Sequence, residues 1–135
     1  FWYRQACAAG YAPAQFDFYD FARTHAELHS DEFLDEALVC LEGAIRQGHR
    51  SAIISGAFHA AFIVQDYKTG FFLYALFEGT EPNFAEQRWS FADQLTQAEI
   101  DEAEQAAAAW RAENQIRDDQ YFFAEVNSPF RQVAP

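Results

Sequence analysis

Residues 58–77 have the sequence FHAAFIVQDYKTGFFLYALF, and this stretch decides the fold that the sequence predicts. Apolar residues alternate along 58–64, as they do in a β-strand. The connecting residues 66–70, DYKTG, have the composition of a hairpin turn with glycine at the tight position. Residues 71–77 are apolar on both faces, and a strand of that kind must be covered on both sides. The stretch therefore predicts a β-hairpin at the centre of a sheet.

Helical patterns lie on either side of the predicted hairpin. Ser30 is a good N-cap for a helix over 31–47, and Gly48 is placed to end that helix. Thr96 and Glu99 match a capping box that opens a second helix, which reaches about residue 116. Pro13 suits the first turn of a further helix over 13–28.

The remaining apolar runs complete the predicted fold. Short strands are expected at 51–55, 88–91 and 121–126. The expected fold class is α+β, with a mainly antiparallel sheet, a central β-hairpin and about three packed helices. At 135 residues the chain is expected to form a single globular domain over 1–135.

The composition combines strong negative charge with many aromatic residues. Asp and Glu number 21 against 9 Lys and Arg, which gives a formal net charge of −12, and aromatic residues make up 18% of the chain. So many aromatics argue against a disordered acidic tail and for a folded domain with an anionic surface. Such a surface repels nucleic acid and anionic membranes and attracts basic proteins. No apolar run approaches the roughly 20 residues that a membrane helix needs.

Acidic residues gather on two of the predicted helices and form the candidate binding site. The sequence predicts a non-enzymatic acidic domain that binds a basic, nuclease-like protein, as inhibitors and immunity proteins of nucleases do by presenting carboxylates in place of phosphates. The alternative is that these carboxylates only keep the surface soluble. The candidate residues are Asp31, Asp35, Glu36 and Glu42 on the helix over 31–47, and Glu99, Asp101 and Glu102 at the start of the next acidic helix.

A second functional hypothesis rests on a cysteine and a histidine. The chain order Cys7, His59 and then Glu78 or Asn83 resembles the nucleophile, base and orienting residue of papain-like cysteine hydrolases. However, Cys7 does not follow a clear helix cap, and the flanking pattern of that family is missing. The alternative is that Cys7 is a structural thiol and His59 a strand histidine. Because two cysteines do not make a disulfide framework, a reducing, cytoplasmic compartment is expected.

His25 and His29 are spaced so that both would lie on one face of a helix. A distant carboxylate could complete a metal site with them. The alternative is that His25 lies at the edge of the core and His29 on the surface. No glycine-rich phosphate loop is present, so no cofactor is expected. The hydrophobic content also predicts a homodimer, with the aromatic residues of 1–3 at or near the interface.

Overall fold

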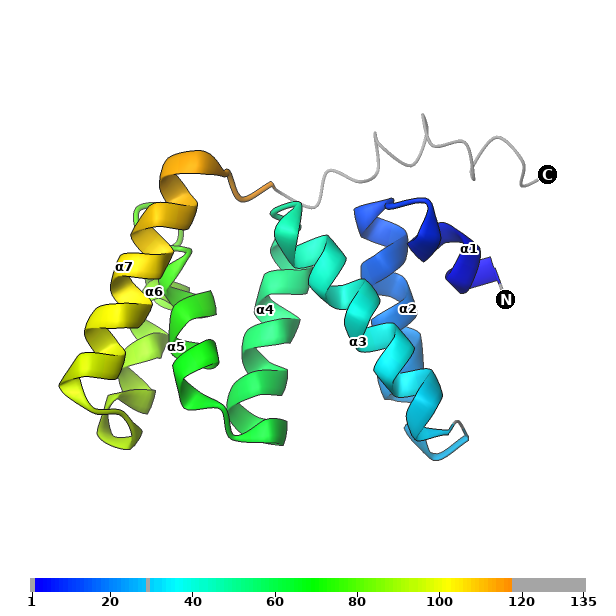
Figure 1. Ribbon diagram of the computed structural model, residues 1–135, viewed down its shortest axis with the longest axis horizontal. Helices are drawn as coiled ribbons and strands as arrows, with labels where there is room; N and C mark the ends of the chain where they lie inside the picture. The colour runs from blue at the N-terminus through cyan, green and yellow to red at the C-terminus, as the bar shows by residue number, and fades with distance from the viewer. Residues whose placement is uncertain (1, 29, 118–135) are drawn as a thin grey trace. The chain divides into compact units, whose positions relative to one another are not determined.

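The computed structural model describes residues 2–28 and 30–117, and these residues form helices joined by short turns (Figure 1). Within these residues there is no β-strand, and extended pairing is confined to an isolated bridge between His49 and Arg117. The fold is therefore all-α, and the predicted α+β class with a central hairpin is wrong. The strand predicted at 121–126 lies outside the described residues.

The contacts divide the chain into two compact units, where the sequence led us to expect a single domain. Among the described residues, the first unit extends to Ala52 and also includes Arg117. The second unit comprises Ile53–Ile116. Each has its own core.

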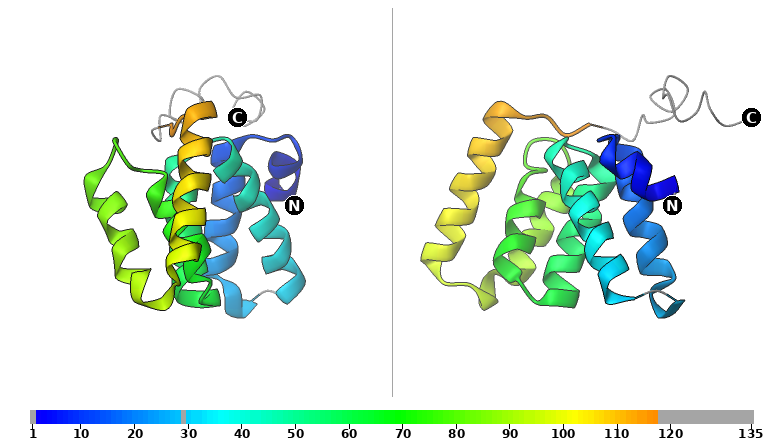
Figure 2. Two further views of the ribbon diagram at one scale, coloured as in Figure 1. Left: turned by 60° about the vertical axis from the view of Figure 1, so that its left-hand side comes forward. Right: turned by 45° about the vertical axis from the view of Figure 1, so that its right-hand side comes forward.

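The first unit is built on an antiparallel pair of helices, α2 (Ala12–Thr24) and α3 (Asp31–Arg46), which lie side by side in Figure 1 and in both views of Figure 2. The 3₁₀-helix η1 (Ala26–Leu28) follows α2, and α1 (Trp2–Ala8) packs against α2. The facing surfaces of α2 and α3 form the core. Its fully buried members include Phe18, Ala22, Ala37, Leu41 and Ala44.

The predicted helix over 31–47 is confirmed almost to the residue. The hydroxyl oxygen of Ser30 accepts a hydrogen bond from the Phe33 amide, as an N-cap does. The helix ends at Arg46, and Gly48 adopts a φ of 78°, a left-handed conformation that glycine takes without strain.

In the second unit the other elements pack around a central helix, α5 (Tyr67–Ala75). α4 (Arg50–Phe58) begins in the first unit and continues without a break into the π-helix η2 (His59–Val64). After α5 (Tyr67–Ala75) come α6 (Pro82–Gln87), the 3₁₀-helix η3 (Arg88–Gln94) and α7 (Gln97–Glu113). α5 packs against η2, α6, η3 and α7, and α7 runs beside it in Figure 2.

The burial of α5 explains why residues 71–77 were mistaken for a strand. An element that is apolar on all sides must be covered on all sides, and this requirement holds for a helix as it does for a strand. The predicted cover is present, but the covered element is a helix. The supposed hairpin turn is the start of that helix: Asp66 is its N-cap, with its carboxylate accepting from the amide and hydroxyl of Thr69 at 3.1 and 2.7 Å.

The predicted strand at 58–64 fails for a different reason. The buried residues of this region recur at spacings of three and four, which is a helical stripe, but most of them are small. Large apolar residues such as Phe58, Phe62 and Val64 lie between and after these small ones, and their spacing resembled the alternation of a β-strand. The buried residues of the stripe are Ile53, Gly56, Ala57, Ala60 and Ala61.

Small residues allow α5 to approach α4 and η2 closely. A Cβ atom placed on Gly70 would lie 3.0 Å from the Cβ of Ala61 and 3.6 Å from the carbonyl oxygen of Ala57. These atoms belong to helix backbone or are bonded to it, so they cannot move without moving the helix. Gly70 is therefore required by helix packing and not by a hairpin turn.

We expect Gly70→Val to destabilise the protein by about 1–3 kcal/mol, because its side chain would force the helices apart. The measurement is the free energy of unfolding in chemical denaturant. Ala108→Val, at an exposed position of α7, is the matched control and should change stability by no more than about 0.5 kcal/mol. Equal effects of the two substitutions would contradict the packing role of Gly70.

Candidate functional site

The acidic residues predicted on the first of the two helices all lie exposed along α3. Glu36 accepts a hydrogen bond from Arg4 at 2.8 Å, and Glu42 lies 3.9 Å from Arg46. Asp31 and Asp35 form no hydrogen bond or ion pair with another described side chain. The face is thus anionic and only partly neutralised from within the chain.

The acidic residues predicted on the second helix are at the start of α7, and two of them have structural roles. Glu99 completes the capping box, since its carboxylate accepts from the amide of Thr96 at 2.9 Å. Glu102 pairs with Lys68 of α5. Asp101 accepts from the Gln97 amide group at 2.9 Å, and no described Lys or Arg pairs with its charge. α3 and α7 belong to different units, so a single surface built from both stays a prediction.

A buried arginine, Arg88, forms ion pairs with two carboxylates of the second unit. The side chain of Arg88 is only 8% exposed, and it forms ion pairs with Glu78 at 3.3 Å and Glu104 at 3.8 Å. Its guanidinium lies 5.7 Å from the ring centre of Phe71 and 5.2 Å from that of Trp89. The Nε and Nη1 atoms donate no hydrogen bond within the described residues, so the aromatic faces supply much of the environment of this charge.

The second unit's other cations are also engaged within it. Arg111 donates from Nη1 to the Ala75 carbonyl oxygen at 2.6 Å and lies 3.7 Å from the carboxylate of Glu78. The carboxylate of Glu102 raises the pKa of Lys68, above all through its hydrogen bond, so this amine stays protonated. Each Lys and Arg of this unit is therefore ion-paired within it, and other carboxylates of the unit are exposed to solvent without such a pair.

We expect Arg88→Ala to destabilise the protein by about 2–4 kcal/mol, because it removes buried packing against two aromatic rings. Arg88→Met fills the same space without a buried charge, so it should stay within about 1 kcal/mol of the parent chain. Thermal and denaturant unfolding of both variants measure the difference. An equal loss in both would show that the ion pairs, and not the packing, hold this side chain.

An exposed apolar surface was missed by the sequence reasoning. Four large side chains at the end of α4 and on η2 are more than half exposed: Phe58 (51%), Phe62 (56%), Ile63 (63%) and Val64 (60%). We call these four residues the η2 surface. The sequence expectation placed this segment in a covered sheet. The helical spacing of the small residues beside them was the signal that could have revealed the outward direction of the large ones.

α5 and α7 also enclose an open groove with a volume of about 490 Å³. The ion pair between Lys68 and Glu102 lies across its lining, so two of its polar side chains already satisfy each other. A lysine held protonated in this way is a poor nucleophile. The lining consists of Lys68, Thr69, Phe72, Glu102, Ala103 and Ala106.

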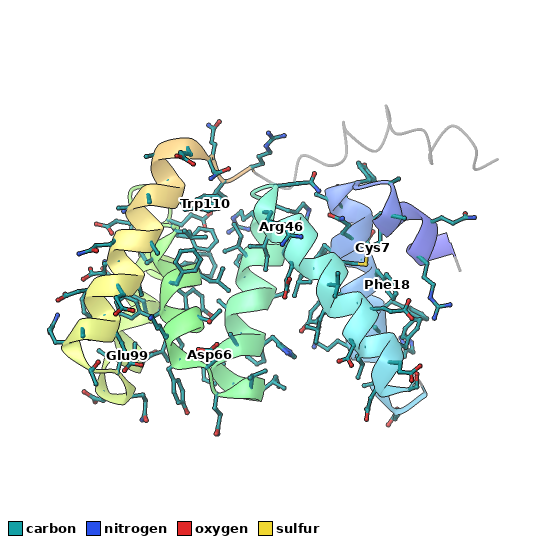
Figure 3. All side chains as sticks on the ribbon, viewed as in Figure 1. Cys7, Phe18, Arg46, Asp66, Glu99 and Trp110 are labelled. Atoms are coloured by element: carbon teal, nitrogen blue, oxygen red, sulfur yellow. A yellow bond between two sulfur atoms is a disulfide. The ribbon has the colours of Figure 1, made fainter. Side chains whose placement is uncertain are left out.

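The structure gives the cysteine hydrolase hypothesis no support. The sulfur of Cys7 is bonded to that of Cys40, so it is not a thiolate in this structure (Figure 3). His59 belongs to the second unit, and burial lowers the pKa of its imidazole. Glu78, the proposed orienting residue, pairs with Arg88 and Arg111. The alternative orienting residue, Asn83, lies exposed in α6.

The metal-site hypothesis required His25 and His29 to lie on one face of a continuous α-helix. α2 ends at Thr24, so the helix does not continue from His25 towards His29. The Nδ1 atom of His25 lies 3.0 Å from the carbonyl oxygen of Phe21, and its ring packs against that of Phe21. His29 lies outside the described residues, among which no group of His, Cys, Asp and Glu side chains is arranged to hold a metal ion.

The Cys7–Cys40 disulfide joins α1 to α3 and corrects the expectation of free thiols. Beside it, the buried Gln15 side chain donates to the Cys7 carbonyl oxygen at 3.2 Å and accepts from Gln47 at 2.9 Å. A covalent bond and the hydrogen bonds of the buried Gln15 amide thus fix the same region. Disulfides persist in oxidising compartments, so this bond weighs against the reducing compartment expected from the sequence.

We expect reduction of the disulfide to lower the free energy of unfolding by about 3–4 kcal/mol, because the bond closes a long loop in the unfolded chain. The sequence separation of its cysteines is 33 residues. Denaturant unfolding with and without a reductant measures the effect, and the Cys7→Ala, Cys40→Ala double variant should not respond to the reductant. A parent chain that is equally indifferent would show that the bond does not form in solution.

Comparison with known proteins finds no match for this chain among protein-family models, curated proteins or solved structures. In the part of the chain that the structure describes, the helices are all too short or too polar to cross a membrane.

Proposed function

We propose that this chain is a non-enzymatic binding domain that engages a basic protein partner. The observation that carries the proposal is the asymmetry of charge pairing. The cations of the second unit, Lys68, Arg88 and Arg111, all form ion pairs with carboxylates of that unit. In the first unit, Arg4, Arg23 and Arg46 are paired as well, whereas the exposed Arg117 forms no ion pair with a described carboxylate.

Many carboxylates, by contrast, have no partner among the described residues. The cost of concentrating like charges on a folded surface is self-repulsion, which a cationic partner would relieve. The exposed carboxylates without a hydrogen bond or ion pair to another described residue are Glu27, Asp31, Glu32, Asp35, Glu86, Asp93 and Glu113.

The formal net charge of −12 supports the same proposal through kinetics. A field of this sign accelerates the approach of a cationic protein and slows that of nucleic acid. Inhibitors of nucleases work on this principle, because a carboxylate can occupy the place of a phosphate. A nuclease-like partner therefore remains the expected class. The predicted homodimer stays a prediction, because the side chains of residues 1–3 lie outside those described.

The test is to capture partners from the native host on the immobilised chain, identify them by mass spectrometry and measure association rates with the purified partner. We expect a basic partner whose association rate falls at least tenfold as added salt shortens the Debye length from about 10 Å to about 3 Å. A neutral or acidic partner, or a rate that salt does not change, would contradict the proposal.

The matched variants separate local charge from total charge. Asp35→Lys together with Asp101→Lys reverses two carboxylates that form no ion pair, and it should slow association. A control chain adds the same total charge at exposed glutamines and should slow association less. The control substitutions are Gln87→Lys, Gln94→Lys, Gln105→Lys and Gln115→Lys.

A further inference from the structure

The second unit turns small residues inward and large apolar residues outward along one continuous helical segment. Ala57, Ala60 and Ala61 are buried, whereas the η2 surface beside them is more than half exposed. Removing a large apolar side chain from water stabilises a protein in proportion to the apolar area that is covered. Four such side chains left largely in water represent stabilisation that becomes available when another molecule covers them.

The backbone that displays these side chains is held in place. η2 is a π-helix, a rare form that occurs mostly as short segments within α-helices and is frequent at functional sites. It ends at Val64, the C-cap Gln65 has a φ of 63°, and the Asp66 amide donates to the Ala60 carbonyl oxygen at 2.7 Å. Because Asp66 also caps α5, the surface is bounded by two fixed helix ends.

The η2 surface is continuous with the aromatic core of its unit. The rings of Phe58 and Phe62 lie 5.0 Å apart, and that of Phe62 lies 5.8 Å from the buried ring of Phe91. Phe91 in turn packs 5.9 Å from Tyr74 and 6.1 Å from Tyr67. A surface supported in this way needs little reorganisation to accept a partner.

Two carboxylates lie close in sequence to the η2 surface and to the ring that supports it. Asp66 follows Val64 by two residues, and its carboxylate accepts only from the neutral groups of Thr69 in the hydrogen bonds described. Asp93 follows Phe91 by two residues in η3 and has no partner among the described residues. There is no Lys or Arg in residues 51–67. Lys68, which comes next, is paired with Glu102.

We propose that the η2 surface docks an amphipathic helix of a partner protein, whose apolar stripe covers the four exposed side chains and whose Lys or Arg residues face Asp66 and Asp93. This inference rests on the proposed function, which it sharpens from a basic partner to a basic amphipathic helix. A second copy of this chain is a poorer fit, because it would bring the same carboxylates together. An anionic membrane is repelled by the same charges.

The test uses a synthetic helix of about five turns with leucine on one face and lysine on the other, which matches the proposed chemistry. Two control peptides replace the leucines by glutamine or the lysines by glutamate. Calorimetry should show that the parent chain binds the leucine–lysine peptide, and that each control peptide binds at least tenfold more weakly.

The variant for the same titration is Ile63→Ser with Val64→Ser, two positions that are 63% and 60% exposed and therefore tolerate substitution. We expect it to weaken binding of the leucine–lysine peptide by about tenfold. Val39→Ser is the matched control, because Val39 is equally exposed at 63% but lies on α3 of the first unit. It should leave the affinity unchanged, and circular dichroism should show the same helicity in all three chains.

The outcomes separate this inference from the proposed function. Equal binding of the leucine and glutamine forms of the lysine peptide, or unchanged binding by the Ile63, Val64 variant, overturns the η2 docking site but leaves a basic partner supported. Failure to bind either lysine peptide overturns the docking site, and a salt-insensitive partner overturns the proposed function. A dimer in sedimentation, or vesicle binding, that the variant abolishes would assign the surface to a second copy or to a membrane and also overturn the inference.

Discussion

The second unit depends on one constraint: residues 70–77 are apolar, and all of them except Phe72 are buried, so the neighbouring elements must cover them. η2, α6, η3 and α7 are arranged by that requirement, and the close approach at Gly70 makes it possible. The inward stripe beside α5 must be small for the helices to approach. The larger apolar residues of the same segment are then left on the outside. The exposed η2 surface thus results from the same helix packing that turns the small residues of this segment towards α5.

Burial of Arg88 has a comparable consequence for charge. Burying a guanidinium against two rings needs nearby carboxylates, and Glu78 and Glu104 supply them from within the unit. Cations used in this way are withdrawn from the surface, so the carboxylates that remain outside dominate its potential. Packing in the interior and anionic character on the exterior are therefore linked, and together they favour a binding role with a cationic, partly apolar partner.

The disulfide changes what the two cysteines mean. As a free thiol, Cys7 could be either a nucleophile or a structural residue, and the sequence could not choose between these two roles. The bond between the two cysteines makes Cys7 a structural element that fastens α1 to α3. Sequence separation does not reveal such a pair, because its cysteines meet only when α1 packs on the helical pair.

Local chemistry determined what the sequence predicted well. The N-cap at Ser30 and the capping box of Thr96 and Glu99 involve residues within one helical turn, so their sequence pattern carries the whole signal. The anionic character of α3 and α7 follows equally from composition. The identity of residues 58–77 was decided by tertiary structure, because an apolar run that is buried all round has the same pattern as a strand or as a helix. Which apolar side chains point outward was decided there too, since the helices must approach closely at Gly70 and only small residues permit that approach.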